Sequence, residues 1–235
     1  MTRLQMILNT LSGTPVPRDL PLPLPLPEWL LVGLLVFSFL LHILFVNLMV
    51  GGSVLTWWLQ RKSLKQDEPG YDRLAREIAA TITVNKSLAV VIGVAPLLSI
   101  NTLYTMYFYT ANALTGMVWI SIIPIVTAAF LLLYYHKYSW DRYGETKKKF
   151  HIGINMAAML LLLFVPLIFL TNINLMQFPQ AWTGVKGFFS AMFMRNVIFR
   201  YFHFLAASMA ITGLFLFWYM KRERFEFMEK IPGMP

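Results

Sequence analysis

An uncharged run of about 30 residues, from Trp29 to Trp58, constrains this chain more than any other feature. A helix rises by about 1.5 Å per residue, so this run is longer than the roughly 20 residues needed to cross the apolar core of a bilayer. Backbone groups in lipid must find hydrogen-bond partners within the protein, which favours a helix. The chain is therefore expected to be an all-α integral membrane protein.

Four further apolar segments are long enough to span a membrane. Together with the first, the expected spans are 28–58, 84–109, 116–135, 152–173 and 197–220. They predict one bundle of five transmembrane helices over residues 28–223, with residues 71–84 beginning as an interfacial helix. Residues 1–27 are expected to be a Pro-rich extracytoplasmic lead-in rather than a cleaved signal peptide, and residues 224–235 a cytoplasmic tail.

Basic residues are concentrated in the connections between these spans. Fifteen of the 20 Lys and Arg residues lie in 59–86, in 136–151 and after residue 220, which five spans place on one side. The positive-inside rule makes that side cytoplasmic, so the N-terminus is expected outside and the C-terminus inside. The net charge of +9 then reflects membrane topology, and nucleic acid is not an expected partner. The expected location is a bacterial or archaeal cytoplasmic (inner) membrane.

Two histidines fall deep inside the expected spans. His42 lies about 14 residues into the first span, and His203 lies about six to ten residues into the fifth. Because an ionisable ring at that depth is costly, each is a candidate functional residue. The alternative for each is a hydrogen bond to a neighbouring helix. The chain has no cysteine, which excludes thiolate zinc sites and covalent c-type haem.

Non-covalent haem b is the cofactor that these two imidazoles favour. His42 and His203 are the candidate axial ligands of haem iron, either for one shared haem or for two haems completed by Met or a partner subunit. Arg200 lies three residues before His203, on the same helical face, and Arg195 lies further out. Both arginines are candidate partners for haem propionates.

The remaining two histidines, His136 and His151, flank the basic loop 136–151. They are interpreted as solvated loop residues, with an inner-side haem between them as the alternative. The aromatic residues at 104–109 are expected to form an interfacial belt, with a quinone cleft as the alternative. Apart from Glu28 at the edge of the first span, no Asp or Glu lies in the five spans, and no nucleophile–base motif is present. No residue is therefore assigned as catalytic.

Four stretches resemble the N-terminal five helices of subunit I of cytochrome bd quinol oxidase. They are FLLHILFVNLMVGG (39–52), NKSLAVVIGVAPLLSINTLYTMYFYT (85–110), YSWDRYGETKKKFH (138–151) and FRYFHFLAASMAITGLFLFWYMKRE (199–223). In that family the first-helix His ligates a high-spin haem, and the fifth-helix His ligates the low-spin haem that takes electrons from quinol. The resemblance implies these roles for His42 and His203. The stretch 119–133 lacks the carboxylates of the family's third helix.

These observations predict a haem b electron-transfer subunit of a multi-subunit respiratory complex rather than an enzyme by itself. Its expected partners are membrane lipid, other membrane subunits, quinone, and an extracytoplasmic c-type cytochrome or another redox subunit. A haem-free membrane anchor or assembly subunit is the first alternative, in which both deep histidines hydrogen-bond between helices. Half of a split bd-type terminal oxidase is the second.

Overall fold

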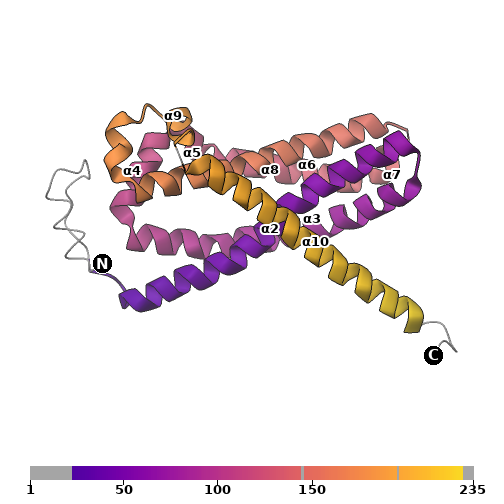
Figure 1. Ribbon diagram of the computed structural model, residues 1–235, viewed down its shortest axis with the longest axis horizontal. Helices are drawn as coiled ribbons and strands as arrows, with labels where there is room; N and C mark the ends of the chain where they lie inside the picture. The colour runs from indigo at the N-terminus through magenta and orange to yellow at the C-terminus, as the bar shows by residue number, and fades with distance from the viewer. Residues whose placement is uncertain (1–22, 144–145, 195, 230–235) are drawn as a thin grey trace.

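The computed structural model describes residues 23–143, 146–194 and 196–229, without the side chains of 84–87, 220 and 223–229. All regular structure in these residues is helical, and two of the long helices, α2 and α10, cross near the middle of the molecule (Figure 1). The elements are α2 (Glu28–Gln66), α3 (Pro69–Leu103), α4 (Thr105–Thr115), α5 (Met117–Ile120), α6 (Ile122–Tyr138), α7 (Trp140–Tyr143), α8 (Lys148–Gln177), the 3-10 helix η1 (Pro179–Gly184), α9 (Phe188–Met192) and α10 (Val197–Glu229).

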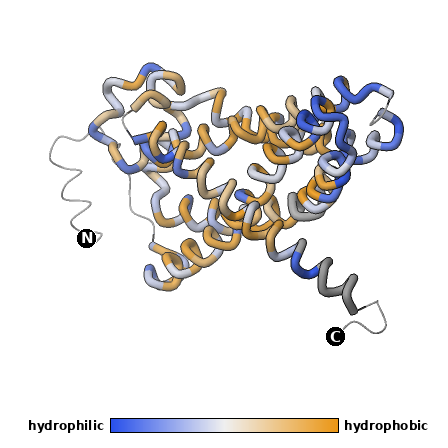
Figure 2. Tube along the Cα trace, turned by 45° about the vertical axis from the view of Figure 1, so that its right-hand side comes forward, coloured by the Kyte–Doolittle hydropathy of each residue, from blue (hydrophilic) through white to orange (hydrophobic). Residues whose placement is uncertain are grey.

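Four helical stretches are long and apolar enough to cross a membrane, namely α2, α5 with α6, α8, and α10 as far as Tyr219. A fifth is α3, which is bent by 43° between Thr83 and Leu88. Hydrophobic residues fill the middle of the molecule, and hydrophilic residues gather towards its ends (Figure 2). The prediction of an all-α membrane protein is confirmed, with four or five spans. The orientation of its termini stays a prediction.

The helix bounds differ from the apolar segments on which the spans were predicted. The predicted interfacial helix 71–84 and most of the second span form the single bent helix α3, and the remainder of that span belongs to α4. Helix α2 continues to Gln66, and α10 continues to Glu229, within the predicted tail. Hydropathy reports where a helix is apolar, whereas charged residues such as Lys and Glu extend it because they are good helix formers.

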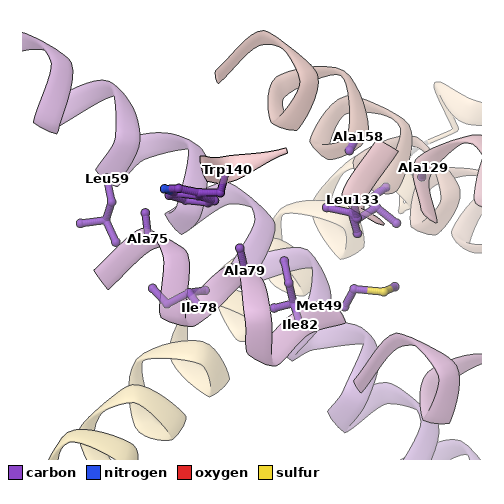
Figure 3. Close-up of a cluster of buried hydrophobic side chains, with 11 residues drawn as sticks. Met49, Leu59, Ala75, Ile78, Ala79, Ile82, Ala129, Leu133, Trp140 and Ala158 are labelled. Carbon is purple, nitrogen blue, oxygen red and sulfur yellow. The ribbon is translucent and has the colours of Figure 1, made fainter. Parts of the chain in front are cut away.

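The main hydrophobic core lies where α2, α3, α6, α7 and α8 meet (Figure 3). Small residues are prominent in it, and they let helix backbones approach closely in a membrane protein. Its buried members are Met49, Leu59, Ala75, Ile78, Ala79, Ile82, Ala129, Leu133, Trp140, Ala158 and Leu162. A second cluster at the other end packs Trp182 of η1 against α4, α8 and α9. Helix α8 is the central helix, because 44% of its most apolar stretch is buried, against 6% for α2.

Two adjacent glycines set the crossing of α2 with its neighbours. A Cβ atom on Gly51 would collide with Thr212 Oγ1 and with the backbone carbonyl of Ser208, both on α10. A Cβ atom on Gly52 would collide with Ile82 on α3. Beside this contact, Ser208 Oγ donates a hydrogen bond of 2.9 Å to Asn47 Oδ1. Helix α2 therefore touches α10 and α3 closely at one level.

The two basic connections lie at the same end of the bundle, as five spans require. Arg76 at the start of α3 forms an ion pair of 2.8 Å with Asp141 of α7. Lys148 at the start of α8 lies 3.4 Å from Asp72 of α3. This end, where 59–86 meets 136–151, is called the basic end below.

Candidate functional site

His42 lies in the half of α2 that points away from the basic end, and its ring is held by α3. Its Nδ1 atom lies 2.9 Å from the carbonyl oxygen of Ala89, so Nδ1 carries the proton and donates. A Cβ atom on Gly93 would lie 2.6 Å from His42 Cε1 and 2.8 Å from Nδ1, so the ring packs directly on the glycine backbone. Nε2, the other nitrogen, has no hydrogen-bond partner among the described side chains. One nitrogen is therefore oriented by α3, and the other makes no hydrogen bond to a described residue.

His203 lies on α10 with its side chain exposed, and no hydrogen bond joins it to a described residue. Arg200, one turn earlier, donates a hydrogen bond of 2.6 Å from Nη1 to Oε1 of Gln177, at the end of α8. Arg195 lies outside the described residues. The predicted pair of Arg200 and His203 therefore shares one region of α10, with the guanidinium tied to α8.

The structure does not bring His42 and His203 into contact. His42 is engaged by Ala89 of α3, whereas α10 meets α2 at Asn47 and Gly51, more than a turn further along α2. From this crossing α2 and α10 diverge, as Figure 1 shows. The arrangement favours two separate sites over one haem shared by both histidines.

The interpretation of His136 and His151 as solvated loop residues is wrong. His136 is 1% exposed and His151 is fully buried. Their rings stack with centroids 4.1 Å apart and planes inclined by 17°, so no space for a haem exists between them. His136 lies in the last turn of α6 and His151 in the first turn of α8, so the stacked rings place these two turns against each other. Their position at the membrane interface stays a prediction, and hydropathy could not show that both residues face inward.

Gln60 of α2 joins the two imidazoles. Its Nε2 atom lies 3.0 Å from His151 Nδ1, and its Oε1 atom lies 2.9 Å from His136 Nε2. The remaining nitrogen of His151, Nε2, lies 2.8 Å from the backbone carbonyl of His136. Gln60 is fully buried, and the three side chains come from α2, α6 and α8. Gln60, His136 and His151 are called the Gln–His cluster below.

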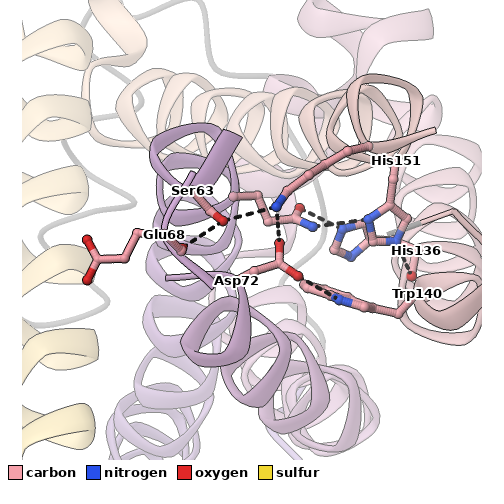
Figure 4. A network of polar contacts seen from close by, with 8 residues as sticks. Ser63, Glu68, Asp72, His136, Trp140 and His151 are labelled. Carbon is pink, nitrogen blue, oxygen red and sulfur yellow. Dashed lines mark hydrogen bonds and ion pairs between the residues drawn. The ribbon is translucent and has the colours of Figure 1, made fainter. Parts of the chain in front are cut away.

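A second layer of polar residues connects this cluster with the basic end (Figure 4). Trp140 presents its ring to both imidazoles, at 5.0 Å from His136 and 4.8 Å from His151, and donates from Nε1 to Asp72 Oδ2 at 3.1 Å. Asp72 pairs with Lys148, whose Nζ also donates to Ser63 Oγ at 3.0 Å. The side chains of Asp72 and Lys148 are each 21% exposed, so this layer reaches solvent.

Sequence reasoning missed Gln60 and Asp72, although a signal for the cluster is present. Ser53, Thr56, Gln60 and Ser63 recur on α2 at intervals of three and four residues, and all four are buried. Lys148, His151 and Asn155 recur in the same way at the start of α8. Polar residues at this spacing share one helical face. Two such faces in a membrane protein are expected to pack against each other, because polar groups need hydrogen-bond partners that lipid does not provide.

No family model, curated protein or solved structure matches this chain. The chemistry available to the described residues therefore rests on their geometry. No group of three or more His, Asp or Glu residues that could hold a metal ion is found among them. His42 fits a haem ligand, because its proton-bearing nitrogen is oriented by a carbonyl as ligand histidines commonly are. His203 fits a haem ligand only if another subunit provides the second ligand, because the His203 side chain is exposed.

Proposed function

We propose that this chain is a haem b-binding electron-transfer subunit of a multi-subunit respiratory complex in the cytoplasmic membrane of a bacterium or archaeon. It would pass electrons between the quinone pool and a partner redox protein, with an extracytoplasmic c-type cytochrome as the leading candidate. The observation that carries the proposal is the hydrogen bond from His42 Nδ1 to the Ala89 carbonyl, inside an apolar span. The resemblance to subunit I of cytochrome bd quinol oxidase supports the same assignment.

His42 would act as an axial ligand through Nε2. The Ala89 carbonyl holds the ring in one tautomer, and Gly93 allows the ring to sit against α3 without a clash. Haem bound there would supply one-electron redox chemistry, and the chain would provide the ligand, its orientation and an apolar surround.

His203 would act as the ligand at a second site, on the outward surface of α10. Arg200 is close enough in sequence to serve a propionate there, after exchanging its hydrogen bond with Gln177. Because His203 is exposed, the second ligand would come from another subunit. Large apolar side chains around it also face outward, including Phe199 at 76% and Phe202 at 63% exposure. These surfaces are suited to contact with lipid or with a membrane partner.

The test is a reduced-minus-oxidised absorption spectrum of the purified chain with its bound partners retained, together with pyridine haemochrome quantitation. One or two b-type haems per chain are expected. His203→Ala should remove a low-spin signal, and His42→Ala should remove a different one. Gln66→Ala, an exposed change on α2, is the control and should keep the haem content. Absence of haem in the preparation with partners retained would refute the proposal.

A haem-free anchor subunit is the second candidate, and one observation favours it. The bond between His42 and Ala89 also satisfies a histidine whose only task is to join α2 to α3. In that case His42→Gln would keep the complex assembled and lower only its stability. A haem-containing wild type would exclude this alternative.

A further inference from the structure

The hydrogen bonds of the Gln–His cluster determine where its protons lie. The carbonyl of His136 can only accept, so His151 Nε2 must carry a proton. If His151 is neutral, its Nδ1 must accept, and the Gln60 amide nitrogen must be the donor. Gln60 Oε1 then accepts from His136 Nε2, which must carry the second proton. Every one of these three bonds is made when both imidazoles are neutral.

The same three contacts can also be made with one more proton. If the Gln60 amide turns over, Oε1 faces His151 and the amide nitrogen faces His136. His151 then carries protons on both nitrogens and donates to Gln60 Oε1 and to the His136 carbonyl. His136 remains neutral, with its proton moved from Nε2 to Nδ1, and its Nε2 accepts from Gln60. One proton is gained in total, and no hydrogen bond is lost.

The geometry points to the Gln–His cluster as a site that binds one proton from the basic end. In the protonated arrangement His136 holds its one proton on Nδ1, which has no hydrogen bond to a described residue, and His151 holds protons on both Nδ1 and Nε2. No electron is transferred. The Gln–His cluster contains no proposed haem ligand, so its test does not depend on whether the proposed function is right.

Two groups of opposite charge lie beside the cluster, towards the basic end. Asp72 of α3 and Lys148 of α8 lie 3.4 Å apart, so their charges offset each other. Trp140 of α7 links the cluster to Asp72, and Gln60 and Ser63 of α2 are uncharged. Arg76 and Asp141 neutralise each other nearer the surface. Asp72 and Lys148 are partly exposed, so protons have access from solvent at this layer.

The polar face also continues beyond the cluster, away from the basic end. Thr56 lies one turn before Gln60 on α2, and Asn155 lies one turn after His151 on α8. Both are fully buried, and Thr56 Oγ1 and Asn155 Oδ1 have no hydrogen-bond partner among the described residues. Buried polar atoms of this kind commonly bind ordered water. A proton on the cluster therefore has polar groups on both sides of it.

The test is solid-state NMR of the full chain in lipid, with isotope-labelled histidine, from about pH 8 to about pH 5. Signals are assigned with His136→Gln and His151→Gln. At high pH both cluster histidines should be neutral with the proton on Nε2. At low pH His151 should become doubly protonated while His136 changes to the Nδ1-protonated tautomer, with the same midpoint. If both stay neutral until the helical circular dichroism is lost, or titrate with no tautomer change, the inference is wrong.

Gln60→Glu provides a variant of nearly identical shape. A carboxylate accepts from both imidazoles, so His151 should be doubly protonated and His136 should keep its proton on Nε2 across the whole range. The tautomer change seen in the wild type should disappear. A wild-type titration pattern in this variant would show that residue 60 does not couple the two histidines, and would overturn the inference.

Discussion

At the residue scale, the ring of His42 depends on the absence of a side chain at position 93. In Gly93→Ala the new Cβ atom would lie 2.6 Å from His42 Cε1, so the ring must leave the Ala89 carbonyl. We expect a loss of about 1–3 kcal/mol in stability, as for overpacking in a core, and a fall in haem content if His42 is a ligand. Thermal unfolding and haemochrome quantitation would measure both.

Gly70→Ala is the matched control for this change, because it lies on the same helix and no atom of a described residue lies within 4 Å of its added Cβ atom. Gly70→Ala should leave both the stability and the haem content close to those of the wild type. An unchanged Gly93→Ala would mean that His42 adopts another position without cost.

Trp140 contributes to the cluster both by packing and by its hydrogen bond to Asp72, and the two can be separated. Trp140→Phe retains an aromatic ring against the imidazoles but removes the donor at 3.1 Å from Asp72 Oδ2. Hydrogen bonds to charged groups contribute about 1.5–3 kcal/mol, and partial exposure of Asp72 should reduce the loss to about 1–2 kcal/mol. Chemical unfolding in detergent would measure this loss.

Trp58→Phe serves as the comparison, because Trp58 is 48% exposed and its indole nitrogen donates to no described residue. Equal effects of the two substitutions would assign the loss to the indole ring rather than to the bond with Asp72.

At the element scale, the crossing of α2 with α10 should not accommodate even one methyl group added at residue 51. The Cβ atom of Gly51→Ala meets backbone atoms of Ser208, which cannot move without displacing α10. We expect α10 to separate from α2, with a loss of at least about 2 kcal/mol and of the Ser208–Asn47 bond. Melting temperature and size-exclusion profile would detect this.

Gly33→Ala places the same methyl group on α2 where no part of the described chain comes within 4 Å, and it should leave stability unchanged. A stable, monodisperse Gly51→Ala would contradict the close crossing. The comparison is informative because hydropathy assigns the two glycines to the same span.

At the scale of the whole molecule, the absence of native cysteine allows the orientation to be tested directly. Lys147 and Lys186 are exposed and lie before and after α8, which is about 45 Å long at 1.5 Å per residue. Lys147→Cys should react with a membrane-impermeant thiol reagent only after cells are opened, and Lys186→Cys should react in intact cells. The reverse pattern would place the basic end outside and contradict the positive-inside prediction.

The sequence by itself determined the class of protein, the approximate spans and the shared end of the two basic connections. Those features follow from properties that each segment carries alone, namely apolar length and charge. Only the tertiary structure decided that His136 and His151 are buried, because their partner Gln60 lies 76 and 91 residues away along the chain. It also decided that His42 faces α3 while His203 faces outward. Helix rotation is set by packing, and packing depends on contacts such as those of Gly51, Gly52 and Gly93 that hydropathy does not record.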